Sequence, residues 1–205
     1  GEILQTARVW GGKEIMAAKS TFGNMVLVLA GICLVCSALL GTVYAVTKAP
    51  IEASELAKVN AAIAAVTPTF DNVPSEEVQK VEGGEIYTFS LGDEVVGYAI
   101  KVSTSGFGGI LQMMVGFTPD GTIYNTSVIS HAETPGLGAK IVDENCAPRA
   151  QVKGKNPATN NIAVTKDNGE IDAITASTIT SRAFLKGVNA AYEVFKNNCM
   201  DHEQE

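Results

Sequence analysis

The chain has 205 residues, a formal net charge of −7, 6% aromatic residues and 20 glycines. This length suits one domain of ordinary size plus a smaller segment, and the composition predicts a turn-rich domain with an aliphatic core. Residues from Thr47 onward carry 12 basic and 20 acidic side chains. That acidic balance excludes an electrostatic surface for nucleic acid.

The first apolar segment predicts a membrane span. Residues 22–46 are 25 consecutive residues without a charge. As a helix they would extend about 37 Å, enough to cross a hydrocarbon core of roughly 30 Å with some tilt. A cleaved signal peptide is the alternative, but its apolar region usually has only about 7–15 residues. We expect a retained single-pass helix over 22–46, preceded by a short N-terminal segment over 1–21 in which Met16 is a plausible native start.

The orientation of this span follows from the basic residues on its two sides. Arg8, Lys13 and Lys19 precede it, whereas Lys48 and Lys58 follow it. Since cytoplasmic flanks carry the excess of Lys and Arg, this slight bias favours a cytoplasmic N-terminus. The C-terminal domain is then expected on the outer, periplasmic side of the cell (inner) membrane.

The four cysteines give no clear metal site. Cys33 and Cys36 lie inside the apolar span, where cysteine behaves as a small apolar residue. A ligand pair shared with a neighbouring protein of the membrane is the alternative. Cys146 and Cys199 fall in the external domain, where a disulfide is permitted, but the sequence does not show that they meet.

The remaining chain predicts an α+β domain. Ala-rich sequence over 50–66 favours a helix within a linker spanning residues 47–75. Strand-like runs separated by turn residues then occur at 86–90, 95–102, 111–117 and 123–130. Residues 143–170 are irregular and polar, and apolar residues spaced by three and four predict a closing helix over 178–196. Strands followed by a helix favour a largely antiparallel sheet with flanking helices over residues 76–197, and then a polar tail over 198–205.

A hydroxyl-rich segment stands directly before the closing helix. Residues 172–178 read Asp-Ala-Ile-Thr-Ala-Ser-Thr. The free N–H groups and positive dipole end of a helix start favour a phosphate there. The simpler interpretation is an N-cap, because Ser and Thr hydroxyls satisfy the same N–H groups. From the residues alone, the cap is favoured.

Two loops upstream have the composition of a ligand site. Residues 105–109, Ser-Gly-Phe-Gly-Gly, join two predicted strands, and so much glycine lets the backbone approach a ligand closely. A flexible hairpin connection is the simpler explanation. Residues 131–138, His-Ala-Glu-Thr-Pro-Gly-Leu-Gly, combine a Pro-Gly turn with polar groups that can hydrogen-bond a ligand. Here the simpler interpretation is a solvated Glu133 and a surface His131.

In this order the three segments resemble the FMN-binding domain family. The flavinylation motif of that family is Asp-x-x-(Ser/Thr)-Gly-Ala-(Thr/Ser), which Asp172, Thr175 and Thr178 match; Ala176 and Ser177 stand where the family usually has Gly and Ala. Glu-Thr-Pro-Gly-Leu-Gly and Gly-Phe-Gly-Gly are also segments of this family. Within it the chain resembles the G subunits of Rnf-type ferredoxin:NAD+ oxidoreductase complexes. The C subunits of Na+-translocating NADH:quinone oxidoreductases are the related alternative.

The resemblance implies FMN attached through a phosphoester to Thr178 by a separate flavin transferase, with Ser177 as a second hydroxyl beside the acceptor. The other residues expected to hold the phosphate are Thr175, Thr180 and Ser181. The residues expected around the flavin ring are Glu133, Thr134, Gly106, Phe107, Gly108 and Gly109.

The resemblance also implies a function. The chain would relay electrons between other membrane subunits of an ion-translocating complex, without a substrate, catalytic residue or metal of its own. Two alternatives stay open: an anchored module that holds flavin non-covalently, and a structural protein that braces membrane partners. A hydrolase is not indicated, because the only histidines are His131 and His202 and no Ser-His-Asp or Cys-His arrangement is evident.

Overall fold

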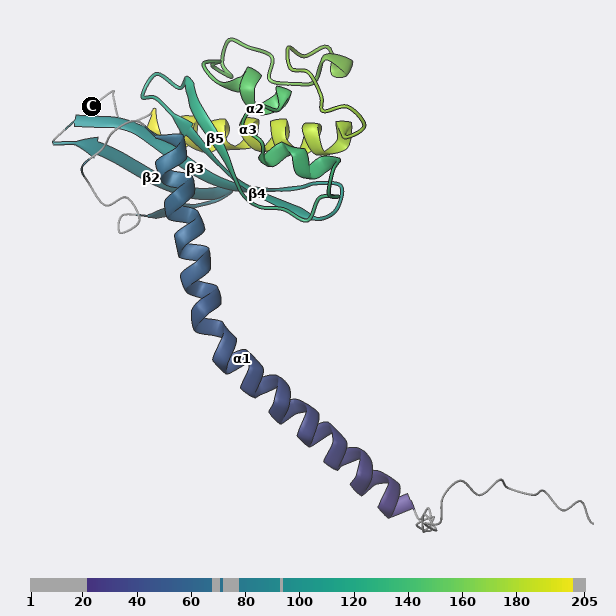
Figure 1. Cartoon of the computed structure of the whole chain (residues 1–205). Helices are drawn as coiled ribbons and strands as arrows, with labels where there is room; N and C mark the ends of the chain where they lie inside the picture. Colours follow the sequence, from purple (N-terminus) through teal and green to yellow (C-terminus); the bar gives the residue numbers. More distant parts are fainter. Residues whose placement is uncertain (1–21, 68–70, 72–77, 93, 201–205) are drawn as a thin grey trace, which may run out of the picture. The chain divides into compact units, whose positions relative to one another are not determined.

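The computed structural model describes residues 22–67, 71, 78–92 and 94–200 (Figure 1). The chain divides into two compact units, Gly1–Glu52 and Ala53–Glu205. The expected N-terminal segment 1–21, most of the linker after residue 67 and residues 201–205 of the tail lie outside the described residues. The elements in chain order are α1 (Phe22–Val66), β1 (Gln79–Val81), β2 (Gly84–Leu91), β3 (Glu94–Ser105), β4 (Ile110–Phe117), β5 (Ile123–Ser130), η1 (Gly138–Val142), α2 (Ala147–Val152), η2 (Thr165–Asp167) and α3 (Thr178–Cys199).

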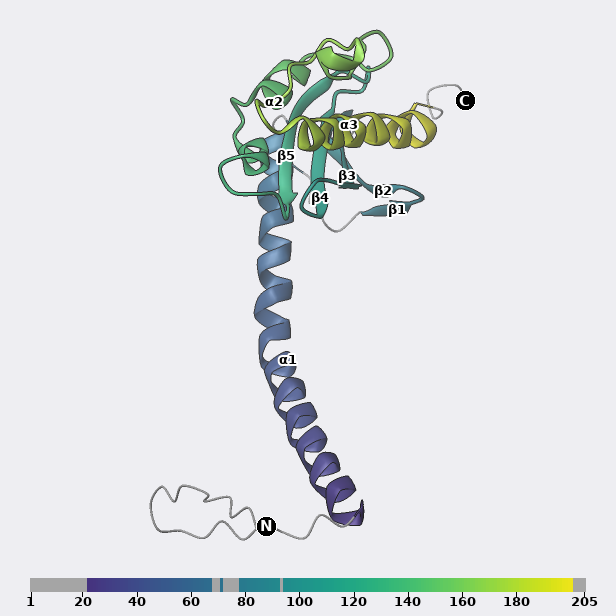
Figure 2. The same ribbon diagram turned by 90° about the vertical axis from the view of Figure 1, so that its right-hand side faces the viewer.

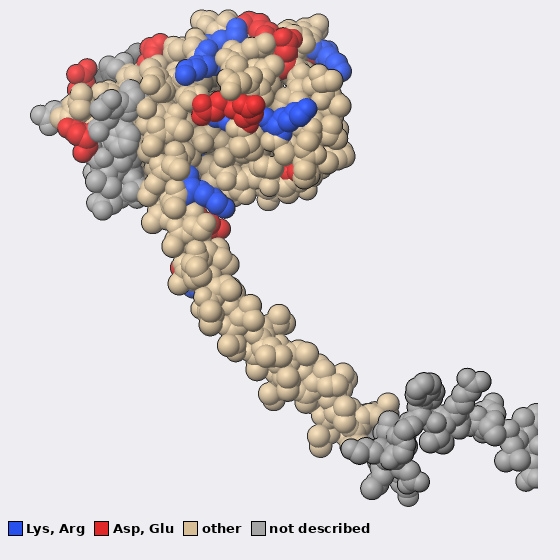
Figure 3. All heavy atoms as spheres, viewed as in Figure 1, with Lys and Arg blue, Asp and Glu red and all other residues tan. Residues whose placement is uncertain are grey.

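The first unit contains the apolar part of α1. Every residue from 22 to 58 is exposed, and Figure 3 shows this part of the helix without charged side chains over most of its length. Among the described residues, α1 is the one helix long and apolar enough to cross a membrane. The sequence predicts a span that ends at residue 46 and a separate linker helix over 50–66, but α1 continues without a break and contains Pro50. The predicted span and linker helix are thus one element.

The second unit is built on a five-stranded antiparallel sheet in which each strand pairs with the next, in the order β1-β2-β3-β4-β5. The predicted α+β class is confirmed. Strands were expected at the positions of β2 to β5, and β5 has the predicted bounds. The three-residue β1 was missed because it is too short to show an alternating pattern. The six-residue α2 falls in the segment expected to be irregular.

Helix α3 covers one face of the sheet (Figure 2). The predicted apolar stripe, Phe184, Val188, Ala191 and Phe195, is fully buried and belongs to the larger core cluster with β3 and β4. The helix lies close to the sheet at Gly187, where a Cβ would overlap the Met113 side chain. Glycine here removes the side chain that would hold the two layers apart.

The opposite face of the sheet receives the C-terminal turns of α1. Ala62, Ile63 and Val66 pack in a second cluster of buried residues, against Tyr87, Phe89, Ala99 and Met114. The Asn125 amide donates a hydrogen bond to the carbonyl oxygen of Ala65 at 2.8 Å. A Cβ at Gly116 would overlap the Val66 carbonyl oxygen. The end of the helix therefore lies flush on β4.

A side chain at Gly116 should loosen this contact. We expect Gly116→Ala to destabilise the second unit by about 1–3 kcal/mol, as overpacking of a close contact does. Urea unfolding of the detergent-solubilised chain, followed by near-UV circular dichroism, measures the change. Gly41→Ala is the matched control, because nothing lies within 4 Å of a Cβ there. Equal unfolding midpoints for the two variants would contradict the flush packing.

Candidate functional site

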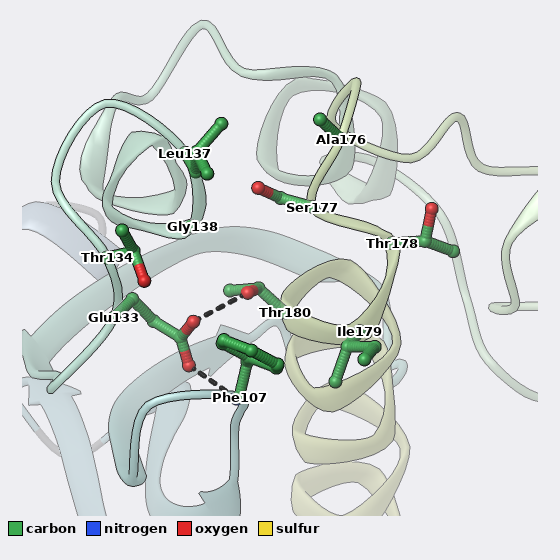
Figure 4. A pocket seen from close by; sticks show the side chains of 10 residues that line it. All are labelled: Phe107, Glu133, Thr134, Leu137, Gly138, Ala176, Ser177, Thr178, Ile179 and Thr180. Carbon is green, nitrogen blue, oxygen red and sulfur yellow. Dashed lines mark hydrogen bonds between the residues drawn. The ribbon is translucent and has the colours of Figure 1, made fainter.

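One cavity of about 360 Å³ brings together the three segments singled out by the sequence (Figure 4). Its volume lies in the usual range of small-molecule sites, about 300–1,000 Å³. The residues that line it are Phe107, Glu133, Thr134, Leu137, Gly138, Ala176, Ser177, Thr178, Ile179 and Thr180.

The sheet places these segments at one edge. Ser105 pairs with Ile110 at the end of the β3–β4 hairpin, and Gln112 on β4 pairs with Ser130 at the end of β5. The glycine-rich loop 106–109 and the segment 131–138 therefore leave the sheet side by side. Helix α3, which packs against β3 and β4, begins at Thr178 beside both of them.

Glu133 connects these elements from the inside of the cavity wall. Its side chain is buried, with 5% of the residue exposed. Oε1 accepts hydrogen bonds from the backbone N–H of Phe107 at 2.8 Å and of Gly108 at 3.4 Å, and Oε2 accepts one from the Thr180 hydroxyl at 2.7 Å. The interpretation of Glu133 as a solvated loop carboxylate is therefore wrong. Both oxygens bind groups of the protein.

Two glycines make this arrangement possible. A Cβ at Gly138 would lie 2.5 Å from Glu133 Oε2 and 2.7 Å from Thr180 Oγ1. A Cβ at Gly106 would overlap Glu133 Oε1. These glycines are thus explained by close approach to a carboxylate rather than by a flexible hairpin.

The start of α3 is not closed by a conventional side-chain cap. Ser177 occupies the N-cap position, but its side chain makes no capping hydrogen bond. Ser181 is fully buried; its hydroxyl accepts from the Ile174 N–H at 3.0 Å and donates to the Ser177 carbonyl oxygen at 3.0 Å. The first-turn N–H groups therefore receive no capping hydrogen bond from Ser177, and Ser181 secures the preceding turn.

The residues expected to bind the phosphate differ in their burial and in whether they line the cavity. Thr178 is half-buried, and in Figure 4 its hydroxyl points away from Glu133 and Thr180. Ser177 is buried and points across the cavity toward the segment containing Gly138. Thr175 is exposed and, like Ser181, is not among the lining residues. Of the loop residues expected around the ring, only Phe107 lines the cavity; Gly106, Gly108 and Gly109 do not.

The sequence singled out only Phe107 of the apolar rim of the cavity and missed Leu137 and Ile179. Phe107, Leu137 and Ile179 are 66%, 44% and 53% exposed, although all three line the cavity. Ile179 lies off the buried stripe of α3, so an apolar residue at that helical position was the available signal. Leu137 and Gly138 belong to the segment 131–138 but had no assigned role. The rim offers an apolar surface beside a hydroxyl-bearing helix start.

Ala176 adopts the left-handed backbone conformation, with φ at 62°. This region costs a residue with a Cβ roughly 1–2 kcal/mol, and glycine enters it freely. The glycine usual at this motif position is therefore explained by the shape of the turn before α3. Alanine, with the smallest side chain that has a Cβ, takes the same conformation here.

Replacing Ala176 by glycine should consequently stabilise the fold. We expect Ala176→Gly to raise the free energy of unfolding by up to about 1 kcal/mol, since relief of strain exceeds the added entropy of the unfolded chain. Ala158→Gly is the control, because Ala158 is exposed and does not have a positive φ; it should be neutral or slightly destabilising. Chemical denaturation of both variants tests this, and a loss of stability in Ala176→Gly would contradict it.

The cysteines form no disulfide: all four thiols are free. Among the described residues no group of three or more His, Cys, Asp or Glu side chains is arranged to hold a metal ion. Burial raises the pKa of the Cys199 thiol to about 11. Burial also raises the pKa of Cys146, although Arg149 partly opposes this through its hydrogen bond and charge.

Cys199 should therefore react slowly with alkylating agents. At pH 8 a thiol of pKa about 11 is roughly 100-fold less ionised than one of pKa about 9, and the thiolate is the reactive form. Peptide mass spectrometry after timed iodoacetamide treatment should show slow labelling of Cys199 that accelerates with rising pH. The same protein in denaturant is the control. Rapid native labelling at pH 8 would contradict the raised pKa.

Comparison with known proteins identifies relatives of most of the chain. The profile of the FMN-binding domain matches residues 106–193. The chain is 37% identical over 143 residues to the G subunit of the Na(+)-translocating ferredoxin:NAD(+) oxidoreductase complex of Acetobacterium woodii, covering 62% of this chain and 68% of that protein. It is 32% identical over 176 residues to the G subunit of the ion-translocating oxidoreductase complex of Pasteurella multocida, covering 79% of this chain and 87% of that protein. Among solved structures, it is similar to the C subunit of a Na(+)-translocating NADH-quinone reductase from Parabacteroides distasonis, with 20% identity, a TM-score of 0.45, and coverage of 60% of this chain and 64% of that one.

Proposed function

Since this chain belongs to the family of G subunits of ion-translocating oxidoreductase complexes, we propose that it is a membrane-anchored carrier of covalently bound FMN that relays electrons within such a complex. The observation that carries the proposal is the single cavity formed by the glycine loop, the segment 131–138 and the start of α3. The anchoring element is α1, and the partners are the other membrane subunits of the complex. The bias of basic residues supports a domain on the outer side of the membrane.

The chemistry of the cavity suits FMN, which combines a flat, largely apolar ring system with a phosphate. The apolar rim of Phe107, Leu137 and Ile179 suits the ring, and the start of α3 suits the phosphate. When bound, FMN supplies the redox chemistry, while the protein contributes attachment, orientation and electrostatics. The described side chains add no metal cluster of their own.

Thr178 is the proposed attachment residue. It is the first residue of α3, its side chain is half-buried, and its hydroxyl points away from the Glu133–Thr180 hydrogen bond. A transferase supplies an activated flavin phosphate. The Oγ–phosphorus bond forms, the hydroxyl proton is released, and the activating group leaves with the electrons of the broken P–O bond. Ser177 is the second candidate, but it is only 7% exposed and faces the cavity interior.

The hydroxyls near Thr178 divide into two groups. Those of Thr180 and Ser181 are already engaged with Glu133 and with the backbone. The groups proposed to receive the phosphate are therefore the first-turn N–H groups of α3, assisted by the hydroxyls of Thr175 and Ser177. The glycine loop and Thr134 are proposed to face the ring.

The covalent link has a direct test. In cells that supply a flavin transferase, the full chain should gain the mass of FMN less one water and show flavin fluorescence in a denaturing gel. Thr178→Val, which removes the hydroxyl while keeping the shape, should lose both signals completely. Ser177→Ala and Thr175→Val serve as matched controls and should keep at least half of the adduct. We base these expectations on position: Thr178 is half-buried and lines the cavity, whereas Ser177 is buried and Thr175 is not among the lining residues.

Other outcomes separate the alternatives. An undiminished adduct in Thr178→Val would move the attachment to another hydroxyl. Flavin that copurifies with the native protein but is lost on denaturation would indicate non-covalent binding. Flavin-free protein from its native membrane would favour a bracing protein without redox function.

A further inference from the structure

We propose that Glu133 is a positioning residue for the flavin, because its carboxyl group fixes the glycine loop against the start of α3. The loop is the ring side of the proposed site, and α3 carries the proposed attachment residue. Glu133 would thus set where the ring lies relative to its tether. This inference rests on the proposed function and assigns to Glu133 a role within it.

The contacts of Glu133 divide between these two parts of the site. One oxygen accepts from the N–H groups of Phe107 and Gly108, 26 and 25 residues away in sequence. The other accepts from the Thr180 hydroxyl, 47 residues away in the opposite direction. Figure 4 shows the carboxyl group between the loop and the helix, with a hydrogen bond to each.

The other hydrogen bonds near the loop do not tie it to the helix. The next connection along α3 is the Thr104 hydroxyl, which donates to the Ala183 carbonyl oxygen at 3.1 Å. That bond attaches the helix to β3 rather than to residues 106–108. Within the loop, the Gly106 N–H donates to the Gly109 carbonyl oxygen at 2.7 Å and closes the turn on itself.

The backbone of the site is shaped around this carboxyl group. Side chains at Gly106 or Gly138 would occupy the space of its two oxygens. The Glu133 N–H in turn donates to His131 Nδ1 at 3.2 Å, which holds the base of the side chain. Hydrogen bonds between backbone N–H groups and a carboxylate are among the stronger protein hydrogen bonds. These contacts fix the Glu133 side chain, and through it the glycine loop and the start of α3.

Removing the side chain would release both segments at once. The Thr180 hydroxyl would lose its partner in a buried setting, which costs its desolvation penalty, and the N–H groups of Phe107 and Gly108 would lose theirs in a part-buried one, from which the loop can move to reach water. Movement of Phe107 with the loop would change the surroundings of a ring bound at the rim. The redox potential of a bound flavin depends on the groups close to its ring.

The test compares Glu133→Ala, Glu133→Gln, Thr180→Val and Thr180→Ser in the full-length, flavinylated chain. Each sample is first shown by intact mass to carry the adduct, and its flavin midpoint potential and absorption spectrum are then recorded. Glu133→Ala should change the ratio of oxidised to reduced flavin at least tenfold at a fixed potential, a shift of about 30 mV for a two-electron couple. Thr180→Val, which breaks only the helix side, should shift it in the same direction.

The conservative variants show how Glu133 acts. Glutamine can accept from the loop and donate to the threonine hydroxyl, and serine keeps a hydroxyl at position 180. The flavin potentials of Glu133→Gln and Thr180→Ser should therefore stay close to the wild-type value, unlike those of Glu133→Ala and Thr180→Val. Glu193→Gln is the control for loss of one negative charge, because Glu193 is exposed on α3 and outside the cavity. It should leave the potential unchanged.

Opposite outcomes would overturn the proposal. Unchanged potential and spectrum in adduct-bearing Glu133→Ala would show that the carboxyl group does not position the ring. A shift in Glu133→Gln as large as in Glu133→Ala would show that charge, not position, is responsible. If Glu133→Ala fails to fold, an unshifted Thr180→Val overturns the inference by itself. Wild-type chain without any adduct would instead overturn the covalent attachment, and the positioning role with it.

Discussion

The carboxyl group of Glu133 is buried and receives its hydrogen bonds from the protein itself. Burying such a group is unfavourable unless hydrogen-bond donors surround it, and this requirement constrains each of the segments packed against Glu133. The glycine loop must present two N–H groups, α3 must present the Thr180 hydroxyl, and Gly138 must leave room between them. Gly106, Gly138 and Thr180 are thus explained by contacts with one side chain.

The sheet allows this local arrangement because a different helix packs on each of its two faces. Helix α3 closes on one face at Gly187, and the end of α1 closes on the other at Gly116. Both contacts use glycine to remove the spacing that a side chain would impose. The site then lies at the edge where β5 and the β3–β4 hairpin end, next to the start of α3. A rigid two-sided core therefore supports a site made largely of loops.

Much of this fold could be predicted from the sequence, since alternating and helical patterns are local. They located β2 to β5 and the start of α3, and the order of strands and helix gave the α+β class. The pattern could not resolve the effect of Pro50, because a proline only biases a helix toward ending. The site was predictable as three segments but not as a set of contacts. Glu133 could not be recognised as a buried connector because its hydrogen-bond partners lie 25 to 47 residues away along the chain.

The left-handed turn at Ala176 bears on how chains of this kind are found by sequence. If the backbone conformation before α3 is what the motif preserves, the motif describes a shape that several small residues can adopt at modest cost. A search pattern that insists on glycine there would pass over this chain. A pattern that also admits alanine, or asparagine with its tolerance of positive φ, would define the family by the backbone conformation at this position rather than by one residue type.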